Sequence, residues 1–368
     1  MHREPVYILL PPGEYFSEYN GGAVAIVVNS MSQHSDYTPM VIGDTCSQPM
    51  TGAQFHPVTP FLYRLRSRSR AYAGACKAWL KRQPAGIVEV HNRIPLLMHL
   101  RDRVPQHKYC MYLHNDPQSM KGAKTAEERR QLLSKVACIY AVSEFVKNRF
   151  LDGLTEGGDK VHVLHNGIEP AVFKNYAEKE KQILFVGRII PEKGVLQLAR
   201  ALKTVLPNHP DWRAVFVGAR HFGNTQPTTS YERAVLAELA DLGEQVQYLN
   251  AIPHKEVMAC YQIAKIAVVP SIWEEPFGRT ALEAMSSSCA LVSSDRGGLA
   301  EVVGSDGLII DPESPREIAA ALQHLIDQPN DAERLAKQAH QRALHLFHQQ
   351  VIAQQHDRCR DSLKLRLY

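Results

Sequence analysis

Two carboxylates stand eight residues apart in the stretch WEEPFGRTALEAM, at Glu275 and Glu283. We interpret Pro276, Phe277 and Gly278 as the start of a helix, because Pro is accepted in a first turn and Gly allows close backbone approach. At 1.5 Å per residue the two carboxylates would then lie roughly 12 Å apart, with the unpaired N–H groups of the first turn between them. This spacing would suit a diphosphate at the helix start and hydroxyl groups at either side. The alternative is a Glu that compensates the helix dipole, followed by an ordinary helix-face Glu.

A second candidate anion site is GRIIPEKG, residues 187–194, which follows the apolar run ILFV and precedes a helical pattern. Arg188 and Lys193 would there add two cations to the N–H groups and dipole of a helix start. A surface loop with two solvated charges is the alternative.

Two further features stand at expected strand ends. Gly21 and Gly22 in YNGGAVAIVV would let a ligand approach the backbone between a strand and a helix. They do not form G-x-G-x-x-G, and no acidic residue at the expected offset completes a dinucleotide fingerprint, which argues against an NAD-dependent oxidoreductase. His114 in CMYLHND is one of 17 histidines, most of which would be structural, but parallel sheets bind ligands at the strand end where it stands.

Short apolar runs that alternate with helical patterns must position these residues. Such runs, when separated by helices, indicate parallel strands buried on both faces. The predicted strands are 6–10, 39–42, 87–90, 109–113, 138–142, 161–164, 183–186, 213–217, 246–249, 266–269, 290–293 and 308–310. Two such series joined by a polar stretch predict two doubly wound α/β domains, over 1–170 and 171–349. The tail 331–368 reads as two or three helices, and its last part, 350–368, is a candidate to cross back onto the first domain.

Composition supports this organisation. A chain of 368 residues with 45% hydrophobic and 22% charged residues suits two globular domains. No apolar run of about 18 residues predicts a membrane span, and the first residues read as a buried strand rather than a signal peptide. The seven cysteines form no C-x-x-C pair, so we expect reduced thiols in a cytoplasmic protein.

Positive charge is concentrated in the first half. Residues 1–175 hold 21 Lys and Arg against 15 Asp and Glu, and seven of the basic residues fall within Arg64–Arg82. A solvated helix face is one interpretation. Peripheral contact with an anionic membrane at its inner face is the other, with Tyr63, Tyr72 and Trp79 as interfacial anchors. No nucleic-acid motif accompanies the basic residues, and we expect no nucleic-acid partner.

Several of these motifs together resemble glycosyltransferase family 4, a family of retaining, nucleotide-sugar-dependent enzymes with the GT-B fold. E-P-F-G-x-x-x-x-E, with VPS before it and SSDRGGLAEVV after it, resembles the E-x7-E signature of that family. FVGRIIPEKG resembles the family's phosphate-binding strand-turn-helix, and YNGGAVAIVV its N-terminal Gly-rich loop. AVSEFVKNRF and VHVLHNGIEPAVF resemble the segment that enters its second domain. The match runs from about Val6 to Phe347 and is strongest over Ile183–Gly304.

The resemblance implies roles for residues of the C-terminal domain. Glu283 would bind the ribose of the donor, Glu275 its sugar, and Arg188 with Lys193 its diphosphate. The backbone of Pro276–Gly278 would complete this donor site.

Roles in the N-terminal domain follow from the same resemblance. Gly21 and Gly22 would lie near the donor phosphates, and His114 would act on the acceptor side, with Asn115 and Asp116 as its neighbours. The catalytic set would be His114, Glu275, Arg188 and Lys193.

The implied reaction takes place in a cleft between the two domains. A sugar, N-acetylglucosamine or a hexose, would pass from a UDP-linked donor to a glycan acceptor such as bacterial lipopolysaccharide core or another surface polysaccharide. Both glutamates would be committed to binding hydroxyls, so we expect front-face attack with retention and no covalent glycosyl-enzyme. Cations and a helix N-terminus would stabilise the leaving diphosphate, and no D-x-D site suggests a metal cofactor.

Two alternatives stay open: a nucleotide-sugar epimerase of the same fold, and a non-catalytic nucleotide-sugar-binding protein. The sequence departs from the family pattern at two places. Ser288 stands where Gly is usual, and Asn250 with Ala251 replaces a Gly beside the expected position of the base.

Overall fold

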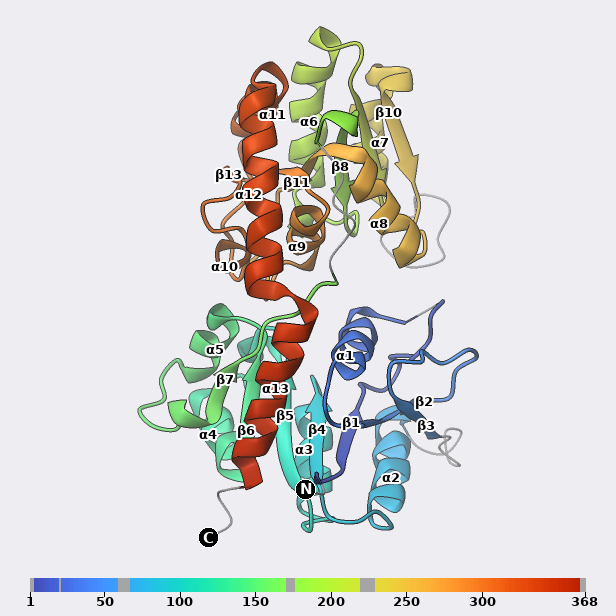
Figure 1. Ribbon diagram of the computed structural model, residues 1–368, viewed down its shortest axis with the longest axis vertical. Coiled ribbons are helices and arrows are strands. Elements are labelled where there is room, and N and C mark those ends of the chain that lie inside the picture. Colours follow the sequence, from blue (N-terminus) through green and yellow to red (C-terminus); the bar gives the residue numbers. More distant parts are fainter. Residues whose placement is uncertain (1–2, 20, 59–66, 170–175, 219–228, 365–368) are drawn as a thin grey trace. The chain divides into compact units, whose positions relative to one another are not determined.

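The computed structural model describes the chain except for residues 1–2, 20, 59–66, 170–175, 219–228 and 365–368. The chain divides into two compact units (Figure 1): unit 1 comprises Met1–Gly167 with Gln349–Tyr368, and unit 2 comprises Ile168–His348. Each unit contains one sheet whose strands pair in parallel, with a helix between most successive strands of the described chain. The predicted class, two doubly wound Rossmann-like domains, is confirmed.

The sheet of unit 1 has seven strands in the order β3-β2-β1-β4-β5-β6-β7. Its strands are β1 (Val6–Leu9), β2 (Met40–Asp44), β3 (Gln54–Val58), β4 (Ile87–His91), β5 (Lys108–Leu113), β6 (Cys138–Ala141) and β7 (Val161–Val163). The helices of this unit are α1 (Ala23–Gln33), α2 (Arg68–Leu80), α3 (Ile94–Arg101), α4 (Ala126–Lys135), α5 (Glu144–Leu151) and α13 (Gln349–Lys364). The strands β1, β4 and β6 are buried along their whole length, as expected of parallel strands covered on both faces.

The prediction missed β3, which among the described residues lies at the edge of the sheet and pairs with β2. Its sequence QFHPV carries few apolar residues, and only Val58 is buried. Pro57 cannot donate a backbone hydrogen bond and is tolerated because the strand is at the edge. An edge strand that is largely uncovered lacks the continuous apolar run on which the prediction relied.

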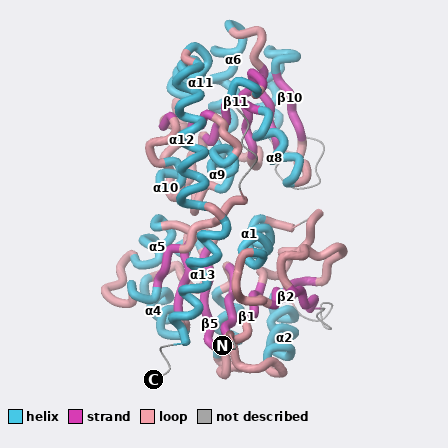
Figure 2. Tube along the Cα trace, viewed as in Figure 1, coloured by secondary structure: helices cyan, strands magenta, loops and turns pink. Residues whose placement is uncertain are grey.

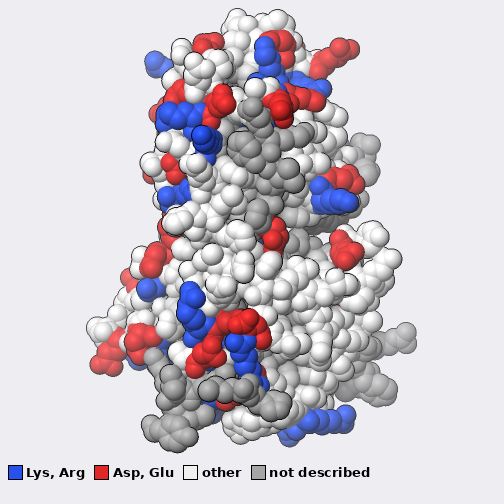
Figure 3. All heavy atoms as spheres, viewed as in Figure 1, with Lys and Arg blue, Asp and Glu red and all other residues white. Residues whose placement is uncertain are grey.

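Helix α13, at the end of the chain, belongs to unit 1 and packs beside α1 (Figure 2). Its buried residues include the apolar Ile352, Ala353 and Leu363, and also the polar or charged His356, Asp357 and Arg360. Figure 3 shows acidic and basic side chains next to one another over this helix. That face of unit 1 therefore carries charge of mixed sign rather than a uniform basic surface.

The sheet of unit 2 has six strands in the order β10-β9-β8-β11-β12-β13. Its strands are β8 (Glu180–Val186), β9 (Arg213–Val217), β10 (Val246–Leu249), β11 (Ala264–Val269), β12 (Ala290–Ser293) and β13 (Leu308–Ile309). Its helices are α6 (Val195–Val205), α7 (Ser230–Leu239), α8 (His254–Ile263), α9 (Arg279–Ser286), α10 (Leu299–Val303), α11 (Pro315–Asp327) and α12 (Pro329–Phe347). The core gathers apolar side chains of β8, β9, β11, β12, α6 and α11.

The basic segment of residues 64–82 is only partly described. Its members Arg64 and Arg66 lie outside the described residues, and so does Tyr63, which precedes the segment. Within the described part, Tyr72 is fully buried and its hydroxyl donates to the carbonyl oxygen of Leu10 (2.9 Å). Trp79 stacks on His56, with ring centroids 4.9 Å apart. The expectation that Tyr72 anchors the protein in a membrane interface is therefore wrong, because its ring holds α2 against the sheet.

Both sheets reverse their strand order at one point, next to the first strand of each unit. In unit 1 this point lies between β1 and β4, and in unit 2 between β8 and β11. Parallel sheets bind ligands outside the carboxyl ends of the strands at such points. The residues singled out from the sequence follow these strands or, for His114, the next strand along.

Candidate functional site

Two loops leave the carboxyl ends of β8 and β11 in unit 2 and are joined to each other. The first carries Arg188, exposed, and a 3₁₀ turn over Pro191–Lys193. Gly194 ends that turn with φ +66°, and a Cβ there would lie 1.9 Å from the carbonyl oxygen of Pro270. The backbone N–H of Ile272 donates to the carbonyl of Glu192 (2.9 Å). Glycine at 194 is thus required for the two loops to meet.

Helix α9 begins after the second loop, at Arg279, with Gly278 as its N-cap at φ +101°. The prediction that Pro276 lies in the first turn is wrong, because Pro276 precedes the helix by three residues. Glu283 is consequently the fifth helical residue, about one turn inside rather than two, and the estimate of 12 Å does not apply. Among the described residues, no side chain caps α9 and its first turn holds no acidic residue. An uncapped N-terminus of this kind attracts anions.

The backbone around Pro276 is held in place by a glycine pair that follows β12. Gly297 forms a bridge with Glu275, and the N–H of Gly298 donates to the carbonyl of Glu275 (2.6 Å). A Cβ at Gly297 would lie 2.4 Å from that same carbonyl oxygen. Phe277 is buried and packs edge-on against Phe347, with centroids 5.8 Å apart. The loop before α9 is therefore rigidly packed on its inner side.

Glu275 and Lys193, predicted to contact different parts of a ligand, are brought together. Lys193 Nζ forms an ion pair with Glu275 Oε1, which also accepts from the hydroxyl of Ser271 (2.6 Å). The Glu275 side chain is only 9% exposed, and a nearly buried carboxylate needs such partners. The pair places a cation and a hydrogen-bond acceptor at one point between the two loops.

Glu283 is buried and accepts two hydrogen bonds at Oε1, from His254 Nε2 (3.0 Å) and from Arg279 Nη2 (3.1 Å). Burial by itself would raise the pKa of Glu283, but the hydrogen bond from His254 and the charge of Arg279 outweigh it and hold the pKa below its ordinary value. Glu283 is therefore an ionised acceptor at neutral pH. Sequence reasoning missed His254, whose contact depends on how α8 packs on α9.

In unit 1, Gly21 and Gly22 precede α1, and Gly22 is the N-cap of that helix. A Cβ at Gly22 would lie 2.4 Å from the carboxylate of Glu14, which accepts from the N–H of Ala25 (3.1 Å). A carboxylate of the chain therefore already lies at the N-terminus of α1. Any phosphate bound there would compete with Glu14. The predicted donor contact of this loop stays a prediction.

His114 follows β5, beside the end of the neighbouring strand β4. Its Nε2 lies 2.8 Å from Nδ1 of His91, the last residue of β4. Its backbone N–H donates to Oδ1 of Asn92 (2.8 Å), a residue held at φ +54°. Sequence reasoning missed both partners, because their contact with His114 depends on the pairing of β4 with β5.

The two residues after His114 differ in their surroundings. Asn115 is exposed. Asp116 caps the short turn that follows, accepting from the N–H of Gln118 (3.0 Å), and forms a bidentate ion pair with Arg149 on α5 (3.0–3.2 Å). The structure thus gives Asp116 a structural role, and its predicted part on the acceptor side stays a prediction.

Ser288, which stands where the family usually has Gly, is buried with φ +57°. A positive φ strains a residue with a Cβ, which explains why a glycine is usual there. Asn250 and Ala251 lie after β10 and are partly buried.

Within the part of the chain that the structure describes, no group of three or more His, Cys, Asp or Glu is arranged to hold a metal ion. In the same residues, no helix combines the length and apolarity that crossing a bilayer needs.

Comparison with known proteins finds matches over most of the chain. Residues 20–172 match the model of Glycosyltransferase Family 4, and residues 169–342 match that of Glycosyl transferases group 1. Spore coat protein SA of Bacillus subtilis is 26% identical over 303 residues, which is 77% of this chain and 80% of that protein. Lipopolysaccharide 1,2-N-acetylglucosaminetransferase of Salmonella typhimurium is 27% identical over 60% of this chain and 58% of that protein.

Solved structures agree on the fold. Sucrose-phosphate synthase from Thermosynechococcus elongatus superposes with a TM-score of 0.78 at 19% identity, covering 99% of this chain and all of that one. Anabaena Alr3699/HepE in complex with UDP-glucose gives a TM-score of 0.74 at 16% identity, covering 97% and 99%. With two family models matched in order over its two Rossmann-like units, the chain belongs to the family 4 glycosyltransferases of the GT-B fold.

Proposed function

We propose that the chain transfers a sugar, N-acetylglucosamine or a hexose, from a UDP-linked donor to a glycan acceptor, with retention at the anomeric carbon. The observation that carries this proposal is the convergence at one point of the sheet of unit 2. This point is where the strand order reverses between β8 and β11. The segments that follow these two strands carry the loop after β8, the uncapped N-terminus of α9, and the carboxylates Glu275 and Glu283. Together they offer cations and N–H groups for a diphosphate, and acceptors for hydroxyls on either side of it.

Each residue has one task in this proposal. Glu283, ionised and buried, accepts hydrogen bonds from the ribose diol, and Glu275 accepts from hydroxyls of the transferred sugar. Arg188, Lys193 and the N-terminus of α9 stabilise the negative charge that develops on the diphosphate as it leaves. His114 in unit 1 contacts the acceptor.

The step itself exchanges two bonds at the anomeric carbon. The bond to the diphosphate oxygen breaks, the bond to the acceptor oxygen forms on the same face, and the acceptor's proton passes to the departing diphosphate. Because protein cations stabilise the leaving group, the step needs no metal cofactor.

The acceptor we favour is the core of a lipopolysaccharide or another surface polysaccharide. The likeness to the Salmonella typhimurium enzyme supports this choice. A cytoplasmic enzyme that acts on such an acceptor would work beside the inner face of the membrane, and the exposed Arg70, Lys81 and Arg82 would favour an anionic surface.

The donor site is tested by a thermal-shift panel of nucleoside diphosphates and their sugars, followed by calorimetry on those that raise the melting temperature. We expect UDP and a UDP-sugar to stabilise the protein, and Glu283→Gln to weaken both. Glu313→Gln, an exposed glutamate of the same unit, is the matched control. If no nucleotide stabilises the protein, or if the two variants bind alike, the assignment fails.

The reaction is tested by turnover of the stabilising donor with core oligosaccharide acceptors. An anomeric proton coupling in the product equal to that of the donor supports retention, and an inverted coupling refutes it. Turnover of the donor without an acceptor would favour the epimerase alternative.

A further inference from the structure

A buried hydrogen-bonded pair of histidines lies behind the acceptor-side position of unit 1. His91 is 1% exposed, and its ring plane lies within 24° of that of His114, with centroids 5.0 Å apart. With Nδ1 of His91 and Nε2 of His114 separated by 2.8 Å, the rings meet edge to edge. Tyr112 lies parallel to both rings, with centroids 4.7 Å from His91 and 4.5 Å from His114. The pair is thus held flat on a buried aromatic face.

The hydrogen bond between His91 Nδ1 and His114 Nε2 contains one proton, which belongs to one of the two rings. The ring that carries this proton determines the tautomer of His114. Burial lowers the pKa of His91 to about 3, opposed by the charge of Glu89 and assisted by those of His356 and Arg360. His91 is therefore neutral at physiological pH and carries a proton on only one nitrogen. If that nitrogen is Nε2, then Nδ1 must accept, and His114 must donate from its own Nε2.

The surroundings of His91 favour a proton on Nε2. This nitrogen is buried, and within the described residues it has no hydrogen-bond partner. His91 lines a cavity of about 10 Å³, room for roughly one water molecule, together with Ser32, Glu89, His356 and Arg360. Ser32 Oγ is likewise buried without a partner among those residues.

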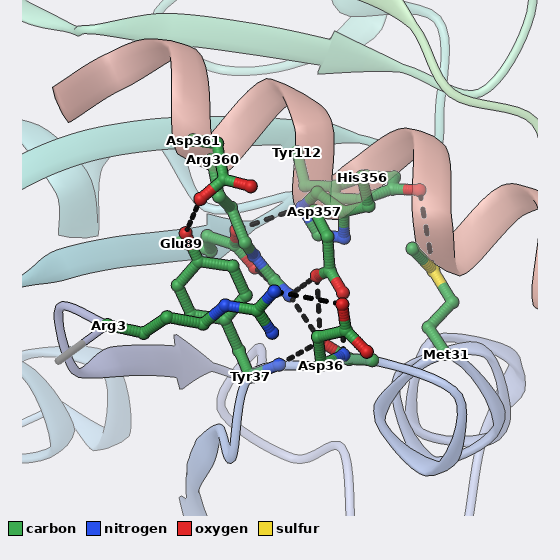
Figure 4. Close-up of polar contacts among 11 residues, drawn as sticks. Arg3, Met31, Asp36, Tyr37, Glu89, Tyr112, His356, Asp357, Arg360 and Asp361 are labelled. Atoms are coloured by element: carbon green, nitrogen blue, oxygen red, sulfur yellow. Dashed lines mark hydrogen bonds and ion pairs between the residues drawn. The ribbon is translucent and has the colours of Figure 1, made fainter. Parts of the chain in front are cut away.

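The negative charge of Glu89 lies on one side of this cavity and influences which nitrogen of His91 carries the proton. Glu89 precedes His91 by two residues on β4, so both side chains point to the same face of the sheet. Its carboxylate is fully buried and is held by Arg360 of α13 through two hydrogen bonds of 2.8 Å each (Figure 4). A carboxylate on this side favours an N–H of His91 that points towards it, and the cavity between them has room for a bridging water that would accept from His91 and donate to Glu89.

We propose that His91 is a positioning residue that holds His114 as the Nε2–H tautomer, and that its own proton is held on Nε2 by the Glu89 side of the cavity. His114 then presents Nδ1 as an acceptor, suited to a hydroxyl of the acceptor glycan. The catalytic consequence rests on the proposed function of His114, whereas the tautomer itself does not.

The tautomer is tested by long-range proton–nitrogen NMR of protein labelled with ¹⁵N-histidine, which separates protonated from bare ring nitrogens. His114→Gln identifies the signals. We expect Nε2 of His114 to be protonated and Nδ1 bare in the unmodified protein, and a mixture of tautomers in His91→Leu. A bare Nε2, or a tautomer that is the same in His91→Leu, would overturn the proposal.

Activity provides the second readout. His91→Leu should lower kcat by about 10- to 100-fold, because His114 loses its orienting partner, with the KM for the donor unchanged. His91→Asn retains an amide oxygen near the position of Nδ1 and should restore most of the loss. His107→Leu is the matched control, since His107 is a buried histidine of the same unit bonded to the carbonyl of Leu80 (3.1 Å).

These two measurements distinguish the effect of His91 on the tautomer of His114 from the role of His114 in the reaction. The expected tautomer shift with an unchanged kcat refutes the role of His114 in the proposed function and leaves the positioning by His91 standing. A kcat loss in His107→Leu as large as in His91→Leu would show that any damage to unit 1 lowers activity, and would overturn the positioning effect on catalysis.

Discussion

Replacing Arg360 by Met should destabilise unit 1 by about 3–5 kcal/mol at pH 7, the cost of leaving a buried charge without its partner. Arg360 is 2% exposed and reaches from α13 to the fully buried Glu89 on β4. It also donates to Asp357 (3.0 Å), as Figure 4 shows, and to the hydroxyl of Ser35 (3.1 Å). Met fills a similar volume, so the loss is electrostatic rather than a cavity. The charge of Glu89 is then left in a region from which water is excluded.

The same substitution should reverse the pH dependence that Glu89 contributes. In the unmodified protein, burial would raise the pKa of Glu89, but the charges of Arg360 and His356 outweigh it and hold the pKa well below its ordinary value. Glu89 therefore contributes stability above the unfolded-state pKa of about 4.3, and this is lost as the pH falls below it.

Without Arg360, burial dominates and the pKa of Glu89 rises. The stability that Glu89 contributes is then present below its unfolded-state pKa and lost as the pH rises through the new value. The difference in the free energy of unfolding between the variant and the unmodified protein should consequently become smaller as the pH falls from 7 to 5. His356, 2.9 Å from Glu89, is the remaining group that can take a proton beside it.

Urea unfolding measures these differences, followed by the fluorescence of Trp79 in a background where Trp212 and Trp273 are Phe. Trp79 then reports on unit 1 alone, which avoids treating two units as one transition. Arg358→Met, an exposed arginine of the same helix, should change stability by no more than about 0.5 kcal/mol. If Arg360→Met costs no more than Arg358→Met at pH 7, or if its cost does not shrink towards pH 5, the reasoning about a buried uncompensated charge is wrong.

Three further predictions concern the donor site and the surface. Glu283→Gln should weaken UDP binding by about 1–3 kcal/mol in calorimetry through lost charge-assisted hydrogen bonds. Because the pKa of Glu283 is held below its ordinary value, the affinity of the unmodified protein should persist to about pH 5, and an early loss would contradict this. Arg188→Ala and Lys193→Ala should each reduce kcat more than stability, and activity should survive EDTA; activity that returns only with added Mg²⁺ or Mn²⁺ would refute a metal-free step. In liposome co-sedimentation at low salt, the protein should bind anionic vesicles and lose binding when Lys81 and Arg82 become Ser; equal sedimentation with neutral vesicles leaves these residues a solvated surface.

The sequence by itself determined the fold class and most of the strands. Strands of a parallel sheet are covered on both faces, so each is a short apolar run that can be recognised without its neighbours. The largest shift in a strand start is at β8, which begins at Glu180 rather than Ile183, because its first three residues are polar and the first two are exposed. β3 was missed because an edge strand carries no such run.

Local chemistry likewise predicted the cationic candidates of unit 2, because Arg188 and Lys193 lie two and seven residues after the end of β8 at Val186. The conformation predicted for the residues between Glu275 and Arg279 was wrong, because Pro276 is compatible with both the first turn of a helix and a loop. The backbone of Glu275 packs against Gly297 and Gly298, which follow β12, and this contact holds the segment before Arg279 as a loop.

Only the tertiary structure decided which side chains share a site. His91 contacts His114 because β4 and β5 are neighbours, and His254 contacts Glu283 because α8 packs on α9. Arg360 lies 271 residues after Glu89, and nothing near either residue in the sequence identifies the other. A buried charge can be compensated by any cation that the fold brings to it, so its partner is set by the long-range arrangement of strands and by the return of α13 to unit 1, not by local pattern.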